Sequence, residues 1–333
     1  MIMRHPNRRH EAVLSAVLLV LALFIGLINP GFFSAEAAFD LLRSSTVIGL
    51  FALGVLVALV AGGIDVSLPA IAAFCLYTTA LFGGAFGVAD HPVLALGLAG
   101  LTGAVLGTMN AFFIHQFALP PLIVTLGTAS LIRGGLLAFV GTRIVTDLPE
   151  SMAAFSHPAA FAGSGPGGAP VGGLVVSFLM FAMAAAGVAF LLGRTTLGRG
   201  IHALGGAPES ARRMGLPIAR LRFIAHGLAG FLAGLAGLAH ASQMRNANPF
   251  DLVGTELTVI AAVVLGGASV AGGRGTVTGT VLGVLILVLV ETGLVIVGLS
   301  SQWHKVVLGG ILLLSVATTV RRVSRAAWRE GMA

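Results

Sequence analysis

Several strongly polar side chains lie within or at the ends of long apolar stretches in this sequence. Arg133 and Glu291 are placed most deeply, Asn110 lies within a third apolar stretch, and Glu256 stands at the end of a fourth. A charge in hydrocarbon is costly, so such residues belong either to buried ion pairs or to a polar pathway. For Arg133 and Glu291 both interpretations stay open: a buried structural pair, or side chains that line a pore.

A second polar group, Asp65-Val66-Ser67, follows Gly62-Gly63 in the link between two apolar stretches. The oxygens of Asp65 and Ser67 can accept hydrogen bonds from the free backbone N–H groups at the start of a helix, which favours a capping role. A gating or pathway role is the alternative for Asp65. Thr125 and Thr128, three residues apart, share one helix face, although threonines inside membranes often bond their own backbone.

Residue patterns for catalysis, metal binding or phosphate binding are missing from the sequence. The nine histidines are scattered without ligand spacing, and the single cysteine, Cys75, excludes an internal disulfide. The pattern G-x-x-x-x-G-K-[ST] is absent, because the only lysine, Lys305, lies between His304 and Val306. We therefore expect no enzymatic activity, no metal and no cofactor in this chain.

The composition indicates what kind of fold positions these residues. Of 333 residues, 57% are hydrophobic and 9% are charged, whereas soluble domains are about 25% charged. A soluble fold with so few charges would expose large apolar patches. The chain is therefore predicted to be an all-α integral membrane protein with a single transmembrane domain over residues 1–333.

Ten apolar segments approach the length of about 20 residues that a spanning helix needs. The eighth is short enough to be partly re-entrant, and a signal peptide at the first segment is the less favoured alternative. The segments lie near residues 12–29, 46–62, 67–83, 92–114, 121–140, 171–192, 223–242, 255–271, 276–297 and 303–320.

Basic residues lie mostly on one side of these ten segments. Fourteen fall before the first segment, between the sixth and seventh, after the eighth and in the tail, against four on the opposite side. Loops rich in Lys and Arg stay in the cytoplasm, so we expect both termini to be cytoplasmic. This clustering indicates membrane topology and no nucleic-acid surface.

Two further features concern packing and loops. The segment from 141 to 170 is rich in Gly, Pro, Ser and Ala, and we expect a surface loop on the non-cytoplasmic side with at most a short helix. Glycines at helical spacing let helices approach closely, either for general packing, which we favour, or at a dedicated dimer face. They occur at Gly103/Gly107, Gly230/Gly234 and Gly275/Gly279/Gly283.

The segment 194–222 is predicted to be a cytoplasmic loop that holds a short helix. Proline and glutamate suit its first turn, two arginines its last turn, and a glycine the left-handed residue after its end. A helix of two turns is marginal alone, so it should dock against a partner; an ordinary basic loop is the alternative. The residues expected to take part are Gly205, Gly206, Glu209, Arg212, Arg213 and Gly215.

Four motifs in order resemble those of ATP-binding-cassette importer permeases, in the branch that serves ribose, xylose, galactose, rhamnose and autoinducer-2. Residues 62–67 are similar to the family's GGID(L/I)S, and Asn110 with 121–134 to its N…P-x-(I/V)-x-T-L-G-T…R-G. Residues 205–215 resemble its GGN…AAR…G loop, and 256–275 its EL…IAAVVLGG-x-S-x-x-GG-x-G. The likeness covers most of the chain.

The resemblance implies a permease subunit of a bacterial inner membrane that provides the path for a monosaccharide. It also implies a cytoplasmic ATP-binding cassette ATPase that docks at the 194–222 loop, an extracytoplasmic sugar-binding protein, and a second permease copy or paralogue. The chain departs from the family at Leu68-Pro69-Ala70, which replaces Val-Gly-Ser, and at Ala207-Pro208, which replaces Asn-Glu. The first change puts local flexibility in doubt, and the second stiffens the start of the short helix.

Neutral polar side chains in or near the apolar segments suit a polyhydroxylated solute better than an amino acid, and the chain offers Ser67, Asn110, Thr125, Thr128 and Gln243. Branched-chain amino-acid permeases, a related branch, are the alternative substrate class. A secondary transporter driven by an ion gradient is a further alternative, although it leaves the coupling-type loop unexplained. The candidate path residues are Asp65, Ser67, Asn110, Thr125, Thr128, Arg133, Glu256 and Glu291.

Overall fold

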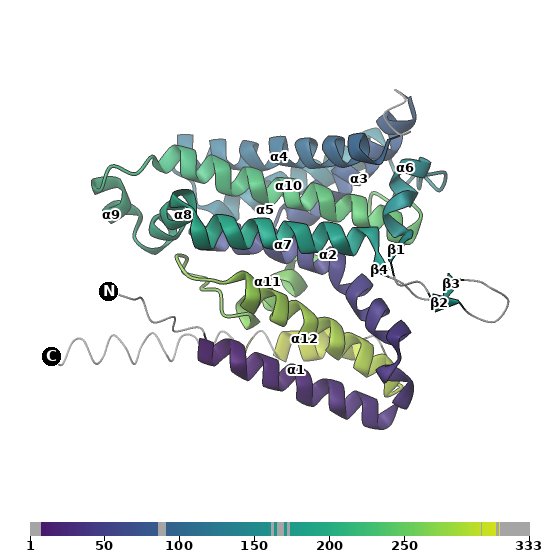
Figure 1. The fold of residues 1–333 in the computed structure, drawn as a ribbon. Coiled ribbons are helices and arrows are strands. Elements are labelled where there is room, and N and C mark those ends of the chain that lie inside the picture. The colour runs from purple at the N-terminus through teal and green to yellow at the C-terminus, as the bar shows by residue number, and fades with distance from the viewer. Residues whose placement is uncertain are drawn as a thin grey trace.

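The computed structural model describes residues 8–85, 91–160, 163–164, 170–171, 174–300, 302–310 and 313. Its helices run side by side in one bundle (Figure 1). They are α1 (Arg8–Ile28), α2 (Ala35–Val60), α3 (Leu68–Ala85), α4 (Pro92–Gln116), α5 (Pro121–Phe139), α6 (Glu150–Ala153), α7 (Val176–Arg194), α8 (Thr196–Gly206), α9 (Pro208–Arg213), α10 (Ile218–Met244), α11 (Thr255–Leu265) and α12 (Val277–Ile296), with 3-10 turns η1 (Pro30–Phe33) and η3 (Ala154–Ser156).

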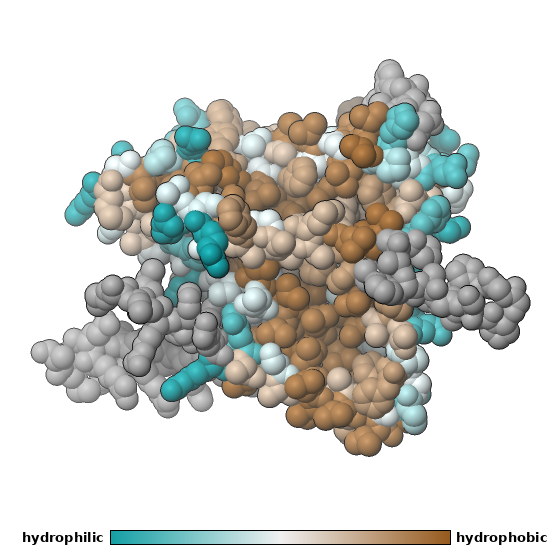
Figure 2. Space-filling model, viewed as in Figure 1, coloured by the Kyte–Doolittle hydropathy of each residue, from teal (hydrophilic) through white to brown (hydrophobic). Residues whose placement is uncertain are grey.

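The prediction of an all-α membrane protein is confirmed. Among the described residues, seven helices are long and apolar enough to cross a bilayer, namely α1, α2, α4, α5, α7, α10 and α12, and α3 and α11 contain shorter apolar helices. Figure 2 shows a broad apolar band between polar edges on one face of the molecule. Of the tenth predicted segment, 303–320, residues 303–310 are helical and most of the remainder lies outside the described residues.

Helix α2 lies at the centre of the bundle. Every residue from Gly49 to Val60 is buried, and α2 packs against α10, α7 and α3 as well as against α11 and α12. Helix α1 packs chiefly on α12 (Figure 1). Helix α2 therefore joins α3, α7 and α10 on one side to α11 and α12 on the other. A displacement of its end reaches both groups of helices.

The glycine stripes predicted from the sequence pack within the chain. Helices α4 and α10 cross so closely that a Cβ on Gly103 would overlap the Gly230 carbonyl oxygen, and one on Gly230 would lie 2.9 Å from the Gly107 nitrogen. Gly279 and Gly283 likewise face the end of α11. The general packing interpretation is confirmed, because backbones fill the space beside these glycines.

The bundle has two distinct ends (Figure 1). We call one the α9 end, which holds α8, α9, the start of α1 and the loop 266–276. The other, the α6 end, holds α6 and the strands β1 (Pro158–Ala160), β2 (Gly163–Ser164), β3 (Pro170–Val171) and β4 (Leu174–Val175), which pair antiparallel as β1 with β4 and β2 with β3.

One part of the expected 141–170 surface loop is packed inside the protein, so that prediction is wrong for it. Ser151, Met152 and Phe155 are buried, and the Ser242 hydroxyl donates to the Ala153 carbonyl. A pairing between Val145 and Ala247 holds the segment against the end of α10. Apolar side chains within a small-residue segment account for this burial, which removes them from water.

Candidate functional site

The short helix predicted between 205 and 215 exists as α9 and ends as expected. Gly215 has φ +77°, its N–H donates to the Arg212 carbonyl at 3.0 Å, and the Leu216 N–H donates to the Ala211 carbonyl at 3.2 Å. This pattern of two bonds around a left-handed glycine is the Schellman motif. The Glu209 and Arg213 side chains are exposed and 3.7 Å apart, so their pairing stabilises the helix only slightly. The helix presents a charged, accessible surface.

The segment before α9 is a second helix, which was not predicted within the 194–222 loop. Helix α8 begins at Thr196 and is capped by Thr195, whose side-chain oxygen accepts from the Gly198 N–H; the helix buries Ile201 and Leu204. The sequence did not predict this helix, because the glycines at 198, 200, 205 and 206 have low helix propensity. Gly205 and Gly206 are therefore the last residues of a helix, and not a flexible turn before α9.

Three backbone segments meet at the end of α8, in an arrangement that we call the glycine crossing and define as Gly62, Gly205 and Gly273. A Cβ on Gly205 would lie 2.7 Å from both the Gly62 and the Gly273 nitrogens and would overlap the Val60 carbonyl oxygen. The Gly273 N–H donates to that carbonyl at 3.1 Å, and His202 Nδ1 lies 3.0 Å from the Gly273 oxygen. The crossing joins α8 to the end of α2 and to the α11–α12 loop.

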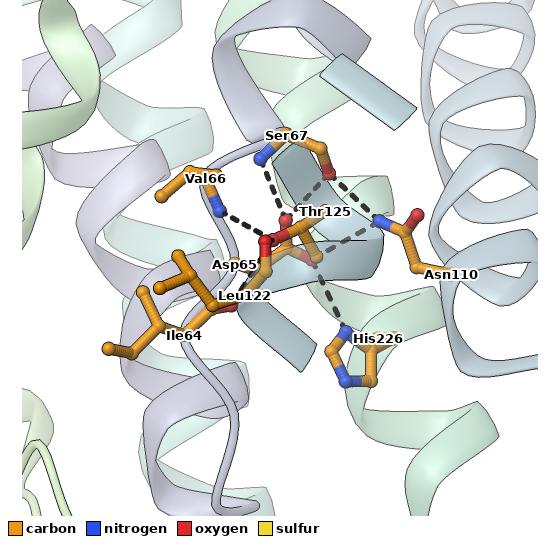
Figure 3. A network of polar contacts seen from close by, with 8 residues as sticks. All are labelled: Ile64, Asp65, Val66, Ser67, Asn110, Leu122, Thr125 and His226. Carbon is orange, nitrogen blue, oxygen red and sulfur yellow. Dashed lines mark hydrogen bonds and ion pairs between the residues drawn. The ribbon is translucent and has the colours of Figure 1, made fainter. Parts of the chain in front are cut away.

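A buried polar network begins three residues after Gly62, and its side chains converge on Asp65 (Figure 3). We call it the Asp65 network and define it as Asp65, Ser67, Asn110, Thr125 and His226. Asp65 Oδ1 accepts from the Ser67 N–H at 2.9 Å and from its hydroxyl at 2.6 Å, and Oδ2 lies 3.2 Å from His226 Nδ1 and 3.5 Å from Asn110 Nδ2. Asn110 also donates to the Ser67 hydroxyl at 2.8 Å. All five residues are buried.

Thr125 attaches α5 to the same link. Its hydroxyl donates to the Ile64 carbonyl at 3.3 Å and accepts from the Val66 N–H at 3.4 Å (Figure 3). The network thus ties the α2–α3 link to α4, α5 and α10. Asp65 bonds the backbone of its own turn, as a capping residue does, and also bonds two distant helices, which capping alone does not require.

His226 was not singled out from the sequence, in which it is one of nine scattered histidines. It is separated from Asp65 by 161 positions, so no local spacing relates the two. Its side chain is 3% exposed and that of Asp65 is 0% exposed. Within the part of the chain that the structure describes, no three His, Cys, Asp or Glu side chains gather as metal ligands.

The charged residues farther along the helices form pairs other than Arg133–Glu291, which was one of the two interpretations left open by the sequence. Arg133 on α5 contacts Glu256 at the start of α11, whereas Glu291 lies 2.6 Å from His304. An Arg133–Glu291 pair is therefore wrong. The Arg133 and Glu256 side chains are 31% and 16% exposed, so this pair borders an open surface.

The exposed face of α5 around Arg133 carries small residues. A Cβ added to Gly127 or to Gly134 would meet no atom within 4 Å, and Ser130 is exposed between them. Thr128, predicted to line a path, is 5% exposed and lies among the buried residues of α5. The structure thus places four predicted path residues in the closed Asp65 network and two, Arg133 and Glu256, beside the open face, whereas Thr128 and Glu291 belong to neither group.

A bundle of apolar helices with a charged pair on an open face and an exposed charged helix at one end is the architecture of a membrane protein with several spans. Residues 37–316 match the sequence profile of the family described as "Branched-chain amino acid transport system / permease component". The chain belongs to this family. The predicted permease function and membrane location are thereby confirmed.

Curated relatives include permeases of autoinducer 2 import systems. The chain is 33% identical to "Autoinducer 2 import system permease protein LsrC" of Yersinia pestis (strain Pestoides F), over 92% of this chain and 83% of that relative. It is 32% identical to the protein of the same name from Yersinia pseudotuberculosis serotype O:3 (strain YPIII), with the same coverage. No solved structure matches the sequence.

Proposed function

We propose that this chain is the membrane-spanning subunit of an ATP-driven importer for a monosaccharide or a similar small polyhydroxylated solute. The observation that carries the proposal is the capped helix α9 at one end of a bundle that belongs to a permease family. The relatives named as autoinducer 2 import permeases support a solute of this class. The chain has no ATP-binding motif, so a separate ATPase subunit supplies the energy.

Helix α9 is the proposed docking element for that ATPase. It is short, exposed and charged at both ends, with Glu209 in its first turn and Arg212 and Arg213 in its last. The Schellman motif at Gly215 fixes the end of the helix, so α9 forms a rigid, exposed element that a partner can bind. An extracytoplasmic solute-binding protein would then dock at the opposite, α6 end.

Ten spans with cytoplasmic termini complete this topology. The α9 end collects Arg8, Arg9 and Arg274 besides the arginines of α8 and α9 (Figure 1), which supports a cytoplasmic position for that end.

The open face of α5 is the proposed wall of the translocation path, completed by a second permease copy or a paralogue. The exposure of Arg133 supports this proposal. A charged side chain that is 31% exposed within a span is unfavourable in contact with lipid and acceptable in contact with water. Together, Arg133 and Glu256 offer hydrogen-bond donors and acceptors, which suits a solute with several hydroxyl groups. Thr128 and Glu291 remain candidates for the same path.

Reconstitution tests this function directly. The permease is placed in liposomes with a candidate ATPase subunit and solute-binding protein from the same organism, and uptake of radiolabelled D-ribose, L-rhamnose, autoinducer 2 and L-leucine is measured with and without ATP. Uptake of a polyhydroxylated solute that requires ATP is expected. Uptake of L-leucine alone would favour the amino-acid class in the family description, and uptake driven by an ion gradient without ATP would contradict the proposal.

A further inference from the structure

We infer that the α2–α3 link, residues 61–67, is the relay that carries movement of α9 into helices α4, α5 and α10, with Asp65 as its positioning residue. The inference rests on the proposed function, because it requires an ATPase that moves α9. It assigns to Asp65, Ser67, Asn110 and Thr125 a role in transmission and not in contact with the solute.

The first half of the relay is held by the glycine crossing. Helix α8 is separated from α9 only by Ala207, so a displacement of α9 moves the end of α8. At that end Gly205 lies against the Gly62 backbone, without room for even a methyl group. Because close-packed backbones cannot slide through one another, a shift of Gly205 must shift Gly62 as well.

The left-handed backbone of Gly62, with φ +90°, makes this contact possible. Helix α2 ends there in a Schellman motif, in which the Gly62 N–H donates to the Leu59 carbonyl and the Gly63 N–H to the Ala58 carbonyl. The link therefore leaves α2 at a fixed angle and packs against the end of α8 at Gly205. Such a rigid corner transmits displacement instead of absorbing it.

The second half of the relay is the Asp65 network. Within five residues of Gly62, the link is bonded to Asn110 on α4, to Thr125 on α5 and to His226 on α10. A buried carboxylate keeps its partners, because an unpaired charge in this environment is strongly unfavourable. Helices α4 and α10 must therefore follow Asp65 when the link moves, and α5 follows through the bonds of Thr125 to the link backbone on either side of Asp65.

Helix α5 connects this relay to the proposed path. It begins at Pro121, and a Cβ on Gly63 would lie 2.9 Å from the Pro121 Cβ. Arg133 lies twelve residues further along the same helix, about 18 Å away at the rise of an α-helix. A tilt imposed on the start of α5 by the link thus repositions the open face around Arg133.

Gly206 provides a matched control for Gly205. A Cβ at this neighbouring position would lie 3.7 Å from the nearest atom, the Gly273 Cα, which is an ordinary contact. Gly205→Ala and Gly206→Ala therefore make the same chemical change at the same end of α8. Only Gly205→Ala pushes the link away.

The test uses a reporter cysteine at Ser130 on the exposed face of α5, introduced into every variant. The native Cys75 is buried and does not compete for a charged maleimide. The reporter permease is coexpressed with its ATPase, and the rate of alkylation is measured in membranes without nucleotide and after trapping with ATP and orthovanadate. Copurification of the ATPase is measured in parallel. Asp65→Asn is a second variant that preserves side-chain volume.

We expect the ATPase to copurify with all variants, since α9 is unchanged. Trapping should alter alkylation of the reporter permease and of Gly206→Ala, whereas Gly205→Ala and Asp65→Asn should lose at least about fivefold of that response, as for loss of an allosteric coupling. A full response in Gly205→Ala and Asp65→Asn would overturn the relay. An equal loss in Gly206→Ala would also overturn it. Failure of the ATPase to copurify with the reporter permease itself would contradict the proposed function instead.

Discussion

The glycine crossing and the open face of α5 use the same kinds of residue in opposite surroundings. At the crossing, a methyl group on Gly205 would meet three backbone atoms, whereas at Gly127 on α5 it would meet none within 4 Å. The charged residues differ in the same way: the Asp65 side chain is fully enclosed, and that of Arg133 is 31% exposed.

This difference in packing distinguishes residues suited to transmit movement between helices from residues suited to contact the transported solute. Close-packed groups move together because they have no free volume, so the crossing and the Asp65 network suit a mechanical role. An open face that carries a charged pair suits contact with a polar solute, since water or solute can reach it. Residue type alone left a capping or a pathway role open for Asp65, and a structural pair or a pore-lining role open for Arg133; the packing favours transmission for Asp65 and solute contact for Arg133.

The largest expected effect belongs to Asp65→Leu. The substitution leaves His226, Asn110 and Ser67 without their shared acceptor and should cost about 3–5 kcal/mol of stability, as for one partner of a buried ion pair. The amount of permease in membranes and its thermal unfolding after purification measure this loss.

Asp65→Asn is the control for that experiment. It keeps an oxygen for Ser67 but presents an amide to His226 and Asn110, so the protein should fold and transport at least about fivefold more slowly. Normal transport by Asp65→Asn would show that the charge contributes nothing and that capping alone explains Asp65.

The next effect is expected at the Arg133–Glu256 pair. Arg133→Gln and Glu256→Gln should each lower uptake about tenfold, in line with the roughly 1.5–3 kcal/mol of a charged hydrogen bond. Because the two side chains act together, the double variant should lose little more than either single variant. Uptake at matched membrane levels measures this, and additive losses would show that the residues act separately.

A smaller effect is expected for Gly215→Val at the end of α9. Valine in a left-handed conformation costs about 1–2 kcal/mol, which should fray α9 and reduce both ATPase copurification and uptake. Gly141→Val is the matched control, because Gly141 has φ +69° and open space but lies at the α6 end. Glu209→Arg should also weaken docking. Unchanged copurification and uptake in Gly215→Val and Glu209→Arg would place the coupling element elsewhere.

The smallest effect is expected for Gly134→Ala on the open face of α5. Alanine there meets no atom within 4 Å and should stabilise the helix by about 0.5–1 kcal/mol. Uptake should stay within about twofold of the unmodified protein, because surface changes rarely exceed 0.5 kcal/mol. The same change at the α4–α10 crossing, Gly230→Ala, should instead destabilise the protein. Equal thermal stability of the two variants would remove the distinction between open and closed glycines.

Features that depend on neighbouring residues could be predicted from the sequence. Helix α9 was predicted from its proline, its end charges and Gly215, because each of these acts within one or two turns. Nine of the ten apolar segments coincide with described helices for the same reason. Helix α8 was missed because burial of Ile201 and Leu204 outweighs the weak helix propensity of its glycines.

Contacts between distant residues could not be predicted in this way. Arg133 and Glu256 are 123 positions apart, and Asp65 and His226 are 161 apart. These pairs are set by how the helices pack, which no local spacing encodes. The sequence therefore indicated most of the polar residues of the site, but neither His226 nor which of these residues are enclosed together.

The comparison between the crossing and the open face is tested most directly by two glycine-to-alanine variants measured side by side. ATP-driven solute uptake is compared for Gly205→Ala and Gly127→Ala in liposomes that contain equal amounts of permease and ATPase. The account predicts uptake near background for Gly205→Ala, with its ATPase still bound, and nearly normal uptake for Gly127→Ala. Equal uptake by the two variants would contradict it.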